Sequence, residues 1–342
     1  MINSVQVPQF EEQKAILIDV RSPSEYRESH IPGAINIPLL NDEHRKLVGT
    51  TYKQVGKDAA MKLGYELVTP IQDSFVKNLK AHTDALAVRI YCARGGLRSQ
   101  LMSKYFMDLG YEVTHLKGGY KAYRNEVLNT LIRLKNIRIL SGYTGSGKTE
   151  ILQSLGDLGE QVLDLEALAH HRGSAFGALG QPEQPSSSMF HNLIYERVKK
   201  FDTSKITWVE SESVTIGKVY LPKELWENMK EAEGYEIILP LEDRVKHTLK
   251  LYGEFELSYL VSCIKQLQKR LGHEEMQLLC ALTEIGELEP VVLRLLKYYD
   301  KAYEHGRAKR ESHKFVKLYF PTLDVVKIAK FLQDLKSNTS KP

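Results

Sequence analysis

Short apolar runs alternate with amphipathic stretches along the first 240 residues, which is the pattern of an α/β protein. The β-branched apolar runs that predict strands lie at residues 15–20, 86–91 and 137–140, and within 161–166 and 206–213. Helical spacing of apolar positions lies at residues 100–109, 123–134, 150–158, 241–271, 273–285 and 290–303. From residue 222 onward the pattern is helical. We therefore expect α/β domains over residues 1–130 and 131–240 and a helical C-terminal part over 241–342.

A cysteine follows one of these predicted strands, and glycines and arginines separate it from the next helix. The stretch reads Cys92-Ala-Arg94-Gly-Gly-Leu-Arg98-Ser. A loop between a strand and a helix start turns backbone N–H groups toward one point and holds an anion, and the two arginines add positive charge. The same field favours a thiolate, so we predict that Cys92 is a nucleophile. The alternative is a small buried residue at a strand end.

The segments around this loop resemble a rhodanese-like domain. Residues 16–26 read Ile-Leu-Ile-Asp-Val-Arg-Ser-Pro-Ser-Glu-Tyr, residues 30–38 read His-Ile-Pro-Gly-Ala-Ile-Asn-Ile-Pro, and residues 117–120 read Lys-Gly-Gly-Tyr. The resemblance covers residues 1–130. It implies that the polar residues of the opening segments orient the cysteine loop, and these are Asp19, Arg21, Glu25 and His30.

The loop departs from the rhodanese pattern in its length. Five residues separate Cys92 from Arg98, as in Cys-x5-Arg phosphatases, whereas many sulfur-carrying rhodaneses have four. A longer loop makes a wider cradle, which suits a tetrahedral oxyanion as well as a lone sulfur. Phosphate-bearing donors therefore join the expected substrates.

Residues 39–89 form a segment longer than a minimal rhodanese needs. It contains Val-Gly-Thr-Thr-Tyr-Lys-Gln-Val at residues 48–55 and a helical pattern at 57–64. Two interpretations stay open for this insertion. It contacts a partner near the Cys92 loop, or it is a surface segment that serves only packing.

The second domain begins with a P-loop. The strand at 137–140 runs into Gly-x4-Gly-Lys-Thr and a helical pattern follows, which is the order that a P-loop requires. The expected phosphate-binding residues are Gly142, Gly145, Ser146, Gly147, Lys148 and Thr149. The glycines let backbone N–H groups curl around phosphate oxygens, Lys148 supplies a point charge, and the Thr149 hydroxyl is a candidate ligand for Mg²⁺.

Acidic side chains follow two later strands, as a P-loop site requires. Asp164 and Glu210 are the candidates, because the carboxyl ends of parallel strands meet at one edge of a sheet. We expect Glu210 to lie near the metal or its water shell, and Asp164 and Glu166 to face the acceptor. The alternative for each is a solvated strand end.

A polar stretch, His-His-Arg-Gly-Ser-Ala-Phe-Gly, occupies residues 170–177. Its histidines lack further His or Cys neighbours at zinc-binding spacing, so we do not expect a zinc site there. His171, Arg172 and Ser174 are expected either to bind a phosphate or ribose of a substrate or to anchor the loop.

Composition narrows the class of protein. The 342 residues suffice for two hydrophobic cores, and 42% hydrophobic with 26% charged residues is ordinary for a soluble globular protein. The three cysteines form no disulfide framework, no run of 18 apolar residues occurs, and no signal peptide is evident, so we expect a cytoplasmic protein without a membrane partner.

Charge and aromatic residues allow a nucleic-acid partner without requiring one. The formal net charge is +4, and residues 297–317 combine basic and aromatic side chains. Such a section can track a phosphate backbone and stack bases. A solvated helix face with core aromatic residues explains it as well.

The combination of the cysteine loop, the P-loop and the His-Arg-Gly-Ser-Ala-Phe-Gly stretch resembles the bacterial tRNA 2-selenouridine synthase family. The resemblance also includes residues 48–54 and is weakest in the C-terminal third. It implies replacement of sulfur by selenium in wobble 2-thiouridine of tRNA, with selenophosphate as donor. It also implies an S-geranyl intermediate made from geranyl diphosphate. Cys92 matches the selenium-carrying cysteine of that family.

The resemblance further implies a selenotransferase and tRNA geranyltransferase with no tightly bound cofactor, and a selenophosphate-producing enzyme as a partner. Two other classes stay open. One is a Cys-x5-Arg phosphatase or sulfurtransferase whose P-loop domain is an ATP-driven regulator. The other is a non-catalytic RNA-binding protein that uses the P-loop as a switch.

Overall fold

The computed structural model describes residues 2–307 and 315–339 of the chain. The chain divides into two compact units. The first unit comprises Met1–Thr130 with His191–Glu196, and the second comprises Leu131–Phe190 with Arg197–Pro342. Each unit is an α/β structure around a parallel sheet, so the predicted fold class is confirmed.

The first unit is built on a five-stranded sheet in the order β1-β5-β4-β2-β3. All the pairs are parallel. The strands are β1 (Asn3–Val5), β2 (Ile16–Asp19), β3 (Ile35–Asn36), β4 (Ala87–Tyr91) and β5 (Glu112–Leu116). The central strand β4 pairs on both sides, so its carboxyl end is held firmly, and Cys92 follows there.

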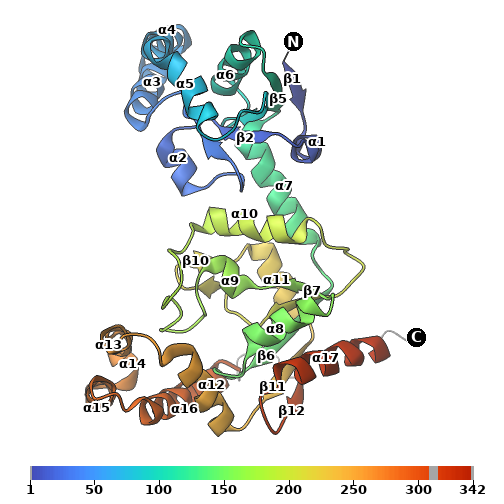
Figure 1. The fold of residues 1–342 in the computed structure, drawn as a ribbon, viewed down its shortest axis with the longest axis vertical. Helices are drawn as coiled ribbons and strands as arrows, with labels where there is room; N and C mark the ends of the chain where they lie inside the picture. Colours follow the sequence, from blue (N-terminus) through green and yellow to red (C-terminus); the bar gives the residue numbers. More distant parts are fainter. Residues whose placement is uncertain (1, 308–314, 340–342) are drawn as a thin grey trace. The chain divides into compact units, whose positions relative to one another are not determined.

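The helices of the first unit pack around this sheet (Figure 1). They are α1 (Val7–Glu12), α2 (Pro23–Glu28), α3 (Asp42–Gln54), α4 (Lys57–Val68), α5 (Gln72–Lys80), α6 (Leu97–Asp108) and α7 (Gly119–Arg133), with a 3₁₀ turn at Thr69–Ile71. The helix α6 begins at Leu97, earlier than the apolar pattern predicts. Its first turn bears polar residues of the cysteine loop, and hydrophobic periodicity marks only the packed turns of a helix.

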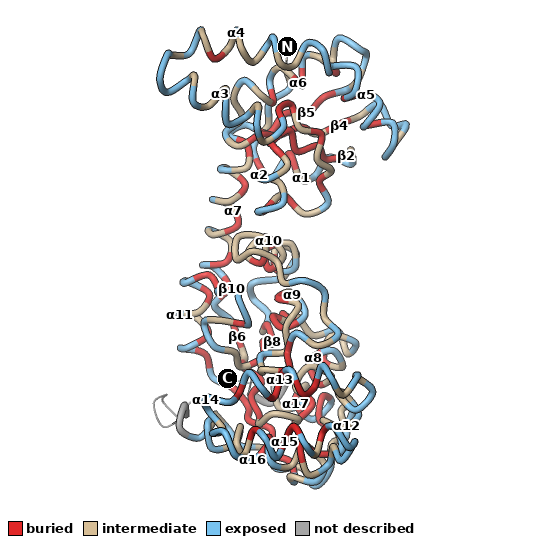
Figure 2. The backbone as a smooth tube through the Cα atoms, turned by 90° about the vertical axis from the view of Figure 1, so that its left-hand side faces the viewer, coloured by how far each residue is buried: buried red, intermediate tan, exposed pale blue. Residues whose placement is uncertain are grey.

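The insertion forms α3, α4 and α5, which lie together beside α6 (Figure 1). No residue of α3 is buried, and in α4 only Ala60 is. Figure 2 shows the difference, since the strands are mainly red whereas α3 and α4 are mainly tan and blue. These two helices therefore contribute little to the core beneath them.

The second unit is built on another parallel sheet, in the order β12-β11-β6-β8-β7. Its strands are β6 (Ile137–Gly142), β7 (Gln161–Leu163), β8 (Thr207–Glu210), β11 (Gly234–Ile238) and β12 (Phe315–Tyr319), and an antiparallel pair is formed by β9 (Thr215–Ile216) and β10 (Val219–Tyr220). The strand β6 is central, and the P-loop follows it directly.

Helices cover this second sheet and extend beyond it. They are α8 (Lys148–Asp157), α9 (Leu165–Ala169), α10 (Ser187–Val198), α11 (Lys223–Glu231), α12 (Leu241–Tyr252), α13 (Leu257–Gln266), α14 (Gln268–Leu271), α15 (His273–Glu284), α16 (Leu288–Arg307) and α17 (Val325–Thr339). Of α10, the middle residues His191–Glu196 belong to the first unit. One cluster of buried side chains fills the space around the sheet, and another joins α13, α15 and α16.

The expectation of helices alone after residue 222 is wrong, because β11 and β12 lie there. Both are runs of five residues, too short for their periodicity to distinguish a strand from part of a helix. The strand β11 pairs with β6 on one side and with β12 on the other, so the C-terminal part supplies the edge strand β12 of the P-loop sheet.

None of the helices within residues 2–307 and 315–339 is both long and apolar enough to cross a membrane.

Candidate functional site

The cysteine loop packs backbone against backbone on the segment at residues 117–120. Gly95 has a φ of +64°, and a Cβ there would lie 2.7 Å from the backbone nitrogen of Gly118. A Cβ on Gly119 would overlap the carbonyl oxygen of Cys92. The backbone N–H of Tyr120 donates to that same carbonyl at 2.8 Å. The glycines of both segments therefore allow the close approach that shapes the loop.

A line of hydrogen bonds leads from the Cys92 sulfur into the core. The Ser99 hydroxyl lies 3.0 Å from Cys92 Sγ and 2.8 Å from His115 Nε2, and His115 Nδ1 lies 3.0 Å from the Ser4 hydroxyl. Burial lowers the pKa of His115. A neutral His115 can donate from Nε2 to Ser99 and accept from Ser4, which leaves the Ser99 proton for the sulfur.

The sequence shows no local sign of this line, because its members come from distant strands. Ser4 lies on β1 and His115 on β5, and the two are paired in register. Only Ser99, directly after Arg98, belongs to the predicted loop. Cys92 is a buried residue, 3% exposed, so only a small reactant reaches its sulfur.

The two arginines of the loop differ in their surroundings. Arg98 donates to both carboxylate oxygens of Glu25, at 2.6 and 3.3 Å, and Arg45 of α3 lies 3.3 Å from the same carboxylate. Burial alone would raise the pKa of Glu25, but the hydrogen bonds and charge of Arg98, with Ser22 N–H and Arg45, lower it to about 2. Arg94 is exposed and makes no hydrogen bond or ion pair with the described residues.

The other polar residues predicted within residues 16–38 support the cysteine loop indirectly. Asp19 and Arg21 form a buried bidentate pair, with 2.6 Å between Oδ2 and Nη2. The Arg21 guanidinium lies 4.1 Å from the centre of the Tyr120 ring. The His30 ring stacks on Tyr26, and its Nδ1 lies 2.9 Å from the Tyr26 carbonyl oxygen. Since Tyr120 follows the glycines that contact Cys92, this arrangement fits an orienting role.

The P-loop has the backbone conformation of a phosphate cradle. Gly145 and Gly147 have φ values of +81° and +71°, and Gly147 is the N-cap of α8. A Cβ on Gly145 would lie 2.9 Å from the carbonyl oxygen of Arg244, and one on Gly142 would collide with Ser146. Side chains are thus excluded where backbone N–H groups converge on the helix start.

The polar side chains of the P-loop are placed around this cradle. Lys148 Nζ lies 3.3 Å from the carbonyl oxygen of Gly142, so the ammonium spans the loop. Within the described chain, the buried hydroxyl of Ser146 has no hydrogen-bond partner. The Thr149 hydroxyl donates to Glu166 at 3.2 Å. These groups provide a charge and two hydroxyls for an incoming anion.

Arg244 of α12 holds the P-loop from the opposite side, which the sequence did not predict. Its Nη1 donates to the carbonyl oxygen of Thr144 at 3.2 Å, and its guanidinium pairs bidentately with Asp300 of α16. Arg244 is 5% exposed. The helical C-terminal part therefore fixes the P-loop conformation through a partly buried ion pair.

Carboxylates gather beside Thr149 at the ends of β7 and β8. Glu210 Oε1 accepts from the backbone N–H of Glu166 at 2.7 Å, and Glu212 shares a hydrogen bond with the Glu166 carboxylate. The sequence predicted Glu210 and Asp164, but Glu166 is the carboxylate that contacts Thr149. Asp164 caps α9 by accepting from Ala167 N–H at 2.9 Å.

Crowding of like charges changes the protonation of these carboxyls. Burial, and then the charges of Asp164 and Glu166, raise the pKa of Glu210 well above its usual value. Burial, the charge of Glu166 and the hydrogen bond to it raise the pKa of Glu212 to about 8, against the lowering effect of Lys148. Burial likewise raises the pKa of Asp164. The positive charge near these carboxyls is therefore too small to keep all of them ionised.

This environment fits Mg²⁺, although among the described residues no three His, Cys, Asp or Glu side chains are arranged to hold a metal by themselves. Mg²⁺ in phosphate sites keeps several waters and takes only one or two protein ligands beside the phosphate oxygens. Thr149 and Glu166 are so placed, and within the described part of the chain the buried Oε2 of Glu210 has no hydrogen-bond partner.

The stretch at residues 170–177 lies against the carboxylates. A Cβ on Gly173 would lie 3.0 Å from Glu212 and 3.1 Å from Glu166. Burial lowers the pKa of His171, whose Nδ1 accepts from Gly173 N–H at 3.2 Å. Arg172 lies over the Tyr252 ring at 5.8 Å, and within the described chain its buried Nη1 has no partner.

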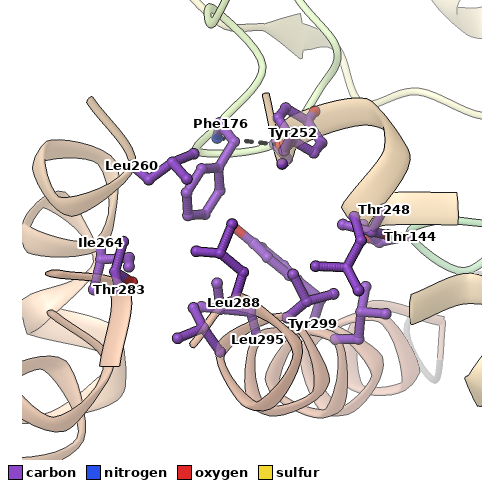
Figure 3. A pocket seen from close by; sticks show the side chains of 16 residues that line it. Thr144, Phe176, Thr248, Tyr252, Leu260, Ile264, Thr283, Leu288, Leu295 and Tyr299 are labelled. Atoms are coloured by element: carbon purple, nitrogen blue, oxygen red, sulfur yellow. Dashed lines mark hydrogen bonds between the residues drawn. The ribbon is translucent and has the colours of Figure 1, made fainter. Parts of the chain in front are cut away.

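An apolar pocket opens between this stretch, the P-loop and the C-terminal helices (Figure 3). Thr144 contributes one wall, Phe176 and Tyr252 a second, and Leu288 and Leu295 of α16 a third. Ser174 also lines it. The enclosed volume is about 50 Å³. The structure thus joins the P-loop, Ser174 and an apolar surface in one place.

The basic and aromatic section at residues 297–317 is described only in part. Residues 308–314 lie outside the described residues. Tyr303 forms a 2.6 Å hydrogen bond with Ser141 at the end of β6, and Tyr299 lines the apolar pocket. These two aromatic residues therefore serve the P-loop unit itself, and nucleic-acid binding by the section stays a prediction.

Comparisons with known proteins identify both units. Residues 135–319 match the family model described as tRNA 2-selenouridine synthase AAA domain, and residues 7–126 match the rhodanese-like domain. Proteins named tRNA 2-selenouridine synthase are similar over most of the chain. That of Shewanella loihica is 37% identical, covering 86% of this chain and 87% of its own. That of a Sulfurovum species is 36% identical, covering 86% and 90%.

Proposed function

The chain belongs to the tRNA 2-selenouridine synthase family, and from this we propose that it converts wobble 2-thiouridine of tRNA to 2-selenouridine in two transfer steps. In the first, a geranyl group passes from geranyl diphosphate to the sulfur. In the second, selenium from selenophosphate replaces the geranylated sulfur. The observation that carries the proposal is that the chain holds two anion-binding loops of different chemistry, one with a cysteine sulfur and one with a carboxylate cluster.

The P-loop unit suits the first step. Lys148 and the N–H groups around Gly145 and Gly147 bind the diphosphate and stabilise the charge on pyrophosphate as it leaves. The sulfur of the base attacks the first carbon of the geranyl chain, the carbon–oxygen bond breaks, and the N3 proton of the base is released. The apolar pocket beside Thr144 accommodates only the end of the chain, given its volume of about 50 Å³.

Thr149 and Glu166 are the residues that would hold Mg²⁺ here, and the ion would neutralise charge on the diphosphate. Glu212 is the candidate acceptor for the N3 proton when it is ionised. Its pKa of about 8 is near the working pH, which suits a group that takes and returns a proton.

The cysteine loop suits the second step. The N–H groups of the loop and the start of α6, with Arg94 and Arg98, bind the phosphate of selenophosphate. Selenium attacks C2 of the base, the C2–sulfur bond breaks, and the geranylthiol leaves with a proton. Water then splits the selenium–phosphorus bond and releases phosphate.

Selenium stays at the selenide level throughout this route, so it needs no oxidant or reductant. Formation of a Cys92–selenium bond would oxidise selenium and require a reductant to complete the transfer. Cys92, a residue that is 3% exposed, is accessible to the small donor but not to a base. We therefore assign Cys92 to contact with the selenium of the donor, where Ser99 orients its sulfur.

The partners follow from these steps. They are tRNA, both donors and an enzyme that produces selenophosphate, and action on tRNA would place the protein in the cytoplasm. The test is mass analysis of tRNA nucleosides after incubation with geranyl diphosphate and then with selenophosphate. We expect S-geranyl-2-thiouridine after the first incubation and 2-selenouridine after the second. Unmodified 2-thiouridine after both would refute the proposal.

A second candidate function is hydrolysis of phosphate esters at Cys92. It is favoured by the five-residue spacing to Arg98 and by the hydrogen bond from Ser99 to the sulfur. Steady hydrolysis of an aryl phosphate that Cys92→Ser abolishes would support it.

A further inference from the structure

The helices of the insertion enclose a large pocket in the first unit. Its volume is about 510 Å³. The walls come from α3, α4 and α5 on one side and from the first turns of α6 on the other, and the lining is predominantly apolar. Neither the cysteine loop chemistry nor the proposed phosphate contacts account for this space.

The apolar side chains with which α3 and α4 line the pocket are only partly packed. Tyr52 and Tyr65 line the pocket and are 59% and 50% exposed, and Ala60 is the buried residue of α4. An amphipathic helix normally buries such a face against a core. Here part of each apolar face lines the pocket instead of packing against other side chains.

Glycines keep this space open. Gly49 lies within α3 and Gly64 within α4, and both line the pocket in ordinary helical conformation. Glycine is among the least favourable residues inside a helix, so some other requirement must select it. A Cβ on Gly64 would meet no atom within 4 Å, so close packing does not explain the glycine. Any larger side chain there would enter the pocket.

The pocket adjoins the cysteine loop. Leu97 and Arg98, which begin α6, belong to its lining. Its floor residues Leu39, Phe75 and Met102 belong to the same buried cluster as Cys92. An apolar group in the pocket would therefore pack against the buried cluster that contains Cys92.

The charged residues of the lining are all basic. They are Arg45, Lys57 and Arg98. Arg45 and Arg98 share one carboxylate, that of Glu25, which lies outside the lining, so the rim keeps a net positive charge. An apolar cavity with a basic rim fits an apolar group attached to a polyanion. A free lipid chain or an apolar peptide would leave the basic rim unused.

We propose that this pocket binds the linear prenyl group on the sulfur of the modified tRNA base while selenium replaces that sulfur. The proposal rests on the proposed function and assigns a binding site for its intermediate. If each of the ten carbon groups of the prenyl chain takes about 30 Å³, the volume of one water molecule in the liquid, the chain needs on the order of 300 Å³. The pocket provides that volume. The basic rim meets the RNA phosphates.

The test fills the pocket without disturbing the core. Gly64→Leu places an apolar side chain in the open space and favours the helix, so the fold is retained. Glu66→Leu adds the same side chain to the same helix at an exposed position outside the lining and serves as the control. Gly49→Leu is a second filling variant on the other helix.

Each full-length variant is assayed separately for the two steps. For selenium transfer to a pre-geranylated RNA, we expect the KM to rise at least about tenfold in the filling variants and to stay unchanged in Glu66→Leu. Geranyl transfer from geranyl diphosphate stays within twofold of the wild type in all three. Unchanged selenium transfer in both filling variants would overturn the proposal. Equal impairment of geranyl transfer would overturn it too, by assigning the pocket to the prenyl donor.

A binding measurement separates this proposal from the proposed function. Equilibrium dialysis compares S-geranyl-2-thiouridine nucleoside with its S-methyl counterpart. We expect the wild type to prefer the geranyl compound at least about tenfold and Gly64→Leu to lose that preference. This result supports the pocket even if no turnover is found, whereas equal binding of the two nucleosides by the wild type would refute it.

Discussion

Glu25 holds Arg98 at the cysteine loop through two hydrogen bonds, of 2.6 and 3.3 Å, from one guanidinium to one carboxylate. The pair orients the arginine before any donor binds, and its low carboxyl pKa of about 2 keeps it ionised across the physiological range. A phosphate entering the loop must share Arg98 with Glu25. The planar guanidinium of Arg98, which can form two hydrogen bonds to one partner, therefore matters more here than its positive charge alone.

Arg98→Lys keeps the positive charge but removes the guanidinium whose two nitrogens bind one partner together. We expect selenium transfer to fall about 10- to 100-fold, the scale of a lost hydrogen bond between charged groups, with geranyl transfer within twofold of the wild type. Steady-state kinetics with varied selenophosphate measure the effect. An unchanged kcat/KM for selenophosphate would show that Arg98 does not bind the donor.

Ser99→Ala removes the hydroxyl that links Cys92 to His115. A hydrogen bond of this kind contributes about 0.5–1.5 kcal/mol, so we expect selenium transfer to fall about two- to tenfold. Ser99→Thr, which retains a hydroxyl, should recover activity. If Ser99→Thr is as impaired as Ser99→Ala, the effect comes from packing rather than from the hydrogen bond.

Several of these residues have no local sequence signal. The cysteine loop and the P-loop are contiguous, so their glycines and basic residues could be recognised from a strand, loop and helix pattern. His115, Arg244 and the pairing of Glu25 with Arg98 depend on chain segments far apart, and one sequence shows no such pairing. Glu212 has a weak signal, because it lies two residues beyond Glu210 at the end of the same strand.

The same limit applies to the fold. The central strands were predicted because apolar runs precede their loops. The strand β12 has no buried residue and lies at the edge of its sheet, so neither burial nor periodicity marks it. In the insertion, the sequence predicted the helical pattern at residues 57–64, which lies within α4, but not α3 or α5. The pocket requires the spacing of four helices, which no local pattern encodes.

Glu212→Gln should change how stability depends on pH. The folded protein raises the pKa of Glu212 from 4.5 to about 8, so it binds this proton more tightly than the unfolded chain does. Wild-type stability should therefore fall, relative to the variant, as pH rises from about 5 to 8. Denaturant unfolding of both proteins at several pH values, without diphosphate or Mg²⁺, measures the difference. A constant difference would show that Glu212 ionises normally.

Cys92→Ser should stop selenium incorporation and leave geranyl transfer largely intact, because the two loops lie in different units. The nearly isosteric hydroxyl keeps the fold but replaces the polarizable sulfur. Mass analysis of the nucleosides should then show accumulated S-geranyl-2-thiouridine. Equal loss of both activities in a folded variant would contradict the division between the loops.

The most direct test of this division is the selenium-transfer activity of Lys148→Ala on pre-geranylated tRNA. Lys148 spans the P-loop, so its removal should lower geranyl transfer about 10- to 100-fold through loss of a charge-assisted contact with the diphosphate. Supplying tRNA that already carries the geranyl group bypasses that step. We predict that the variant converts it to 2-selenouridine at the wild-type rate. If this conversion falls as far as geranyl transfer does, the P-loop serves selenophosphate or the tRNA, and the assignment of donors to loops is wrong.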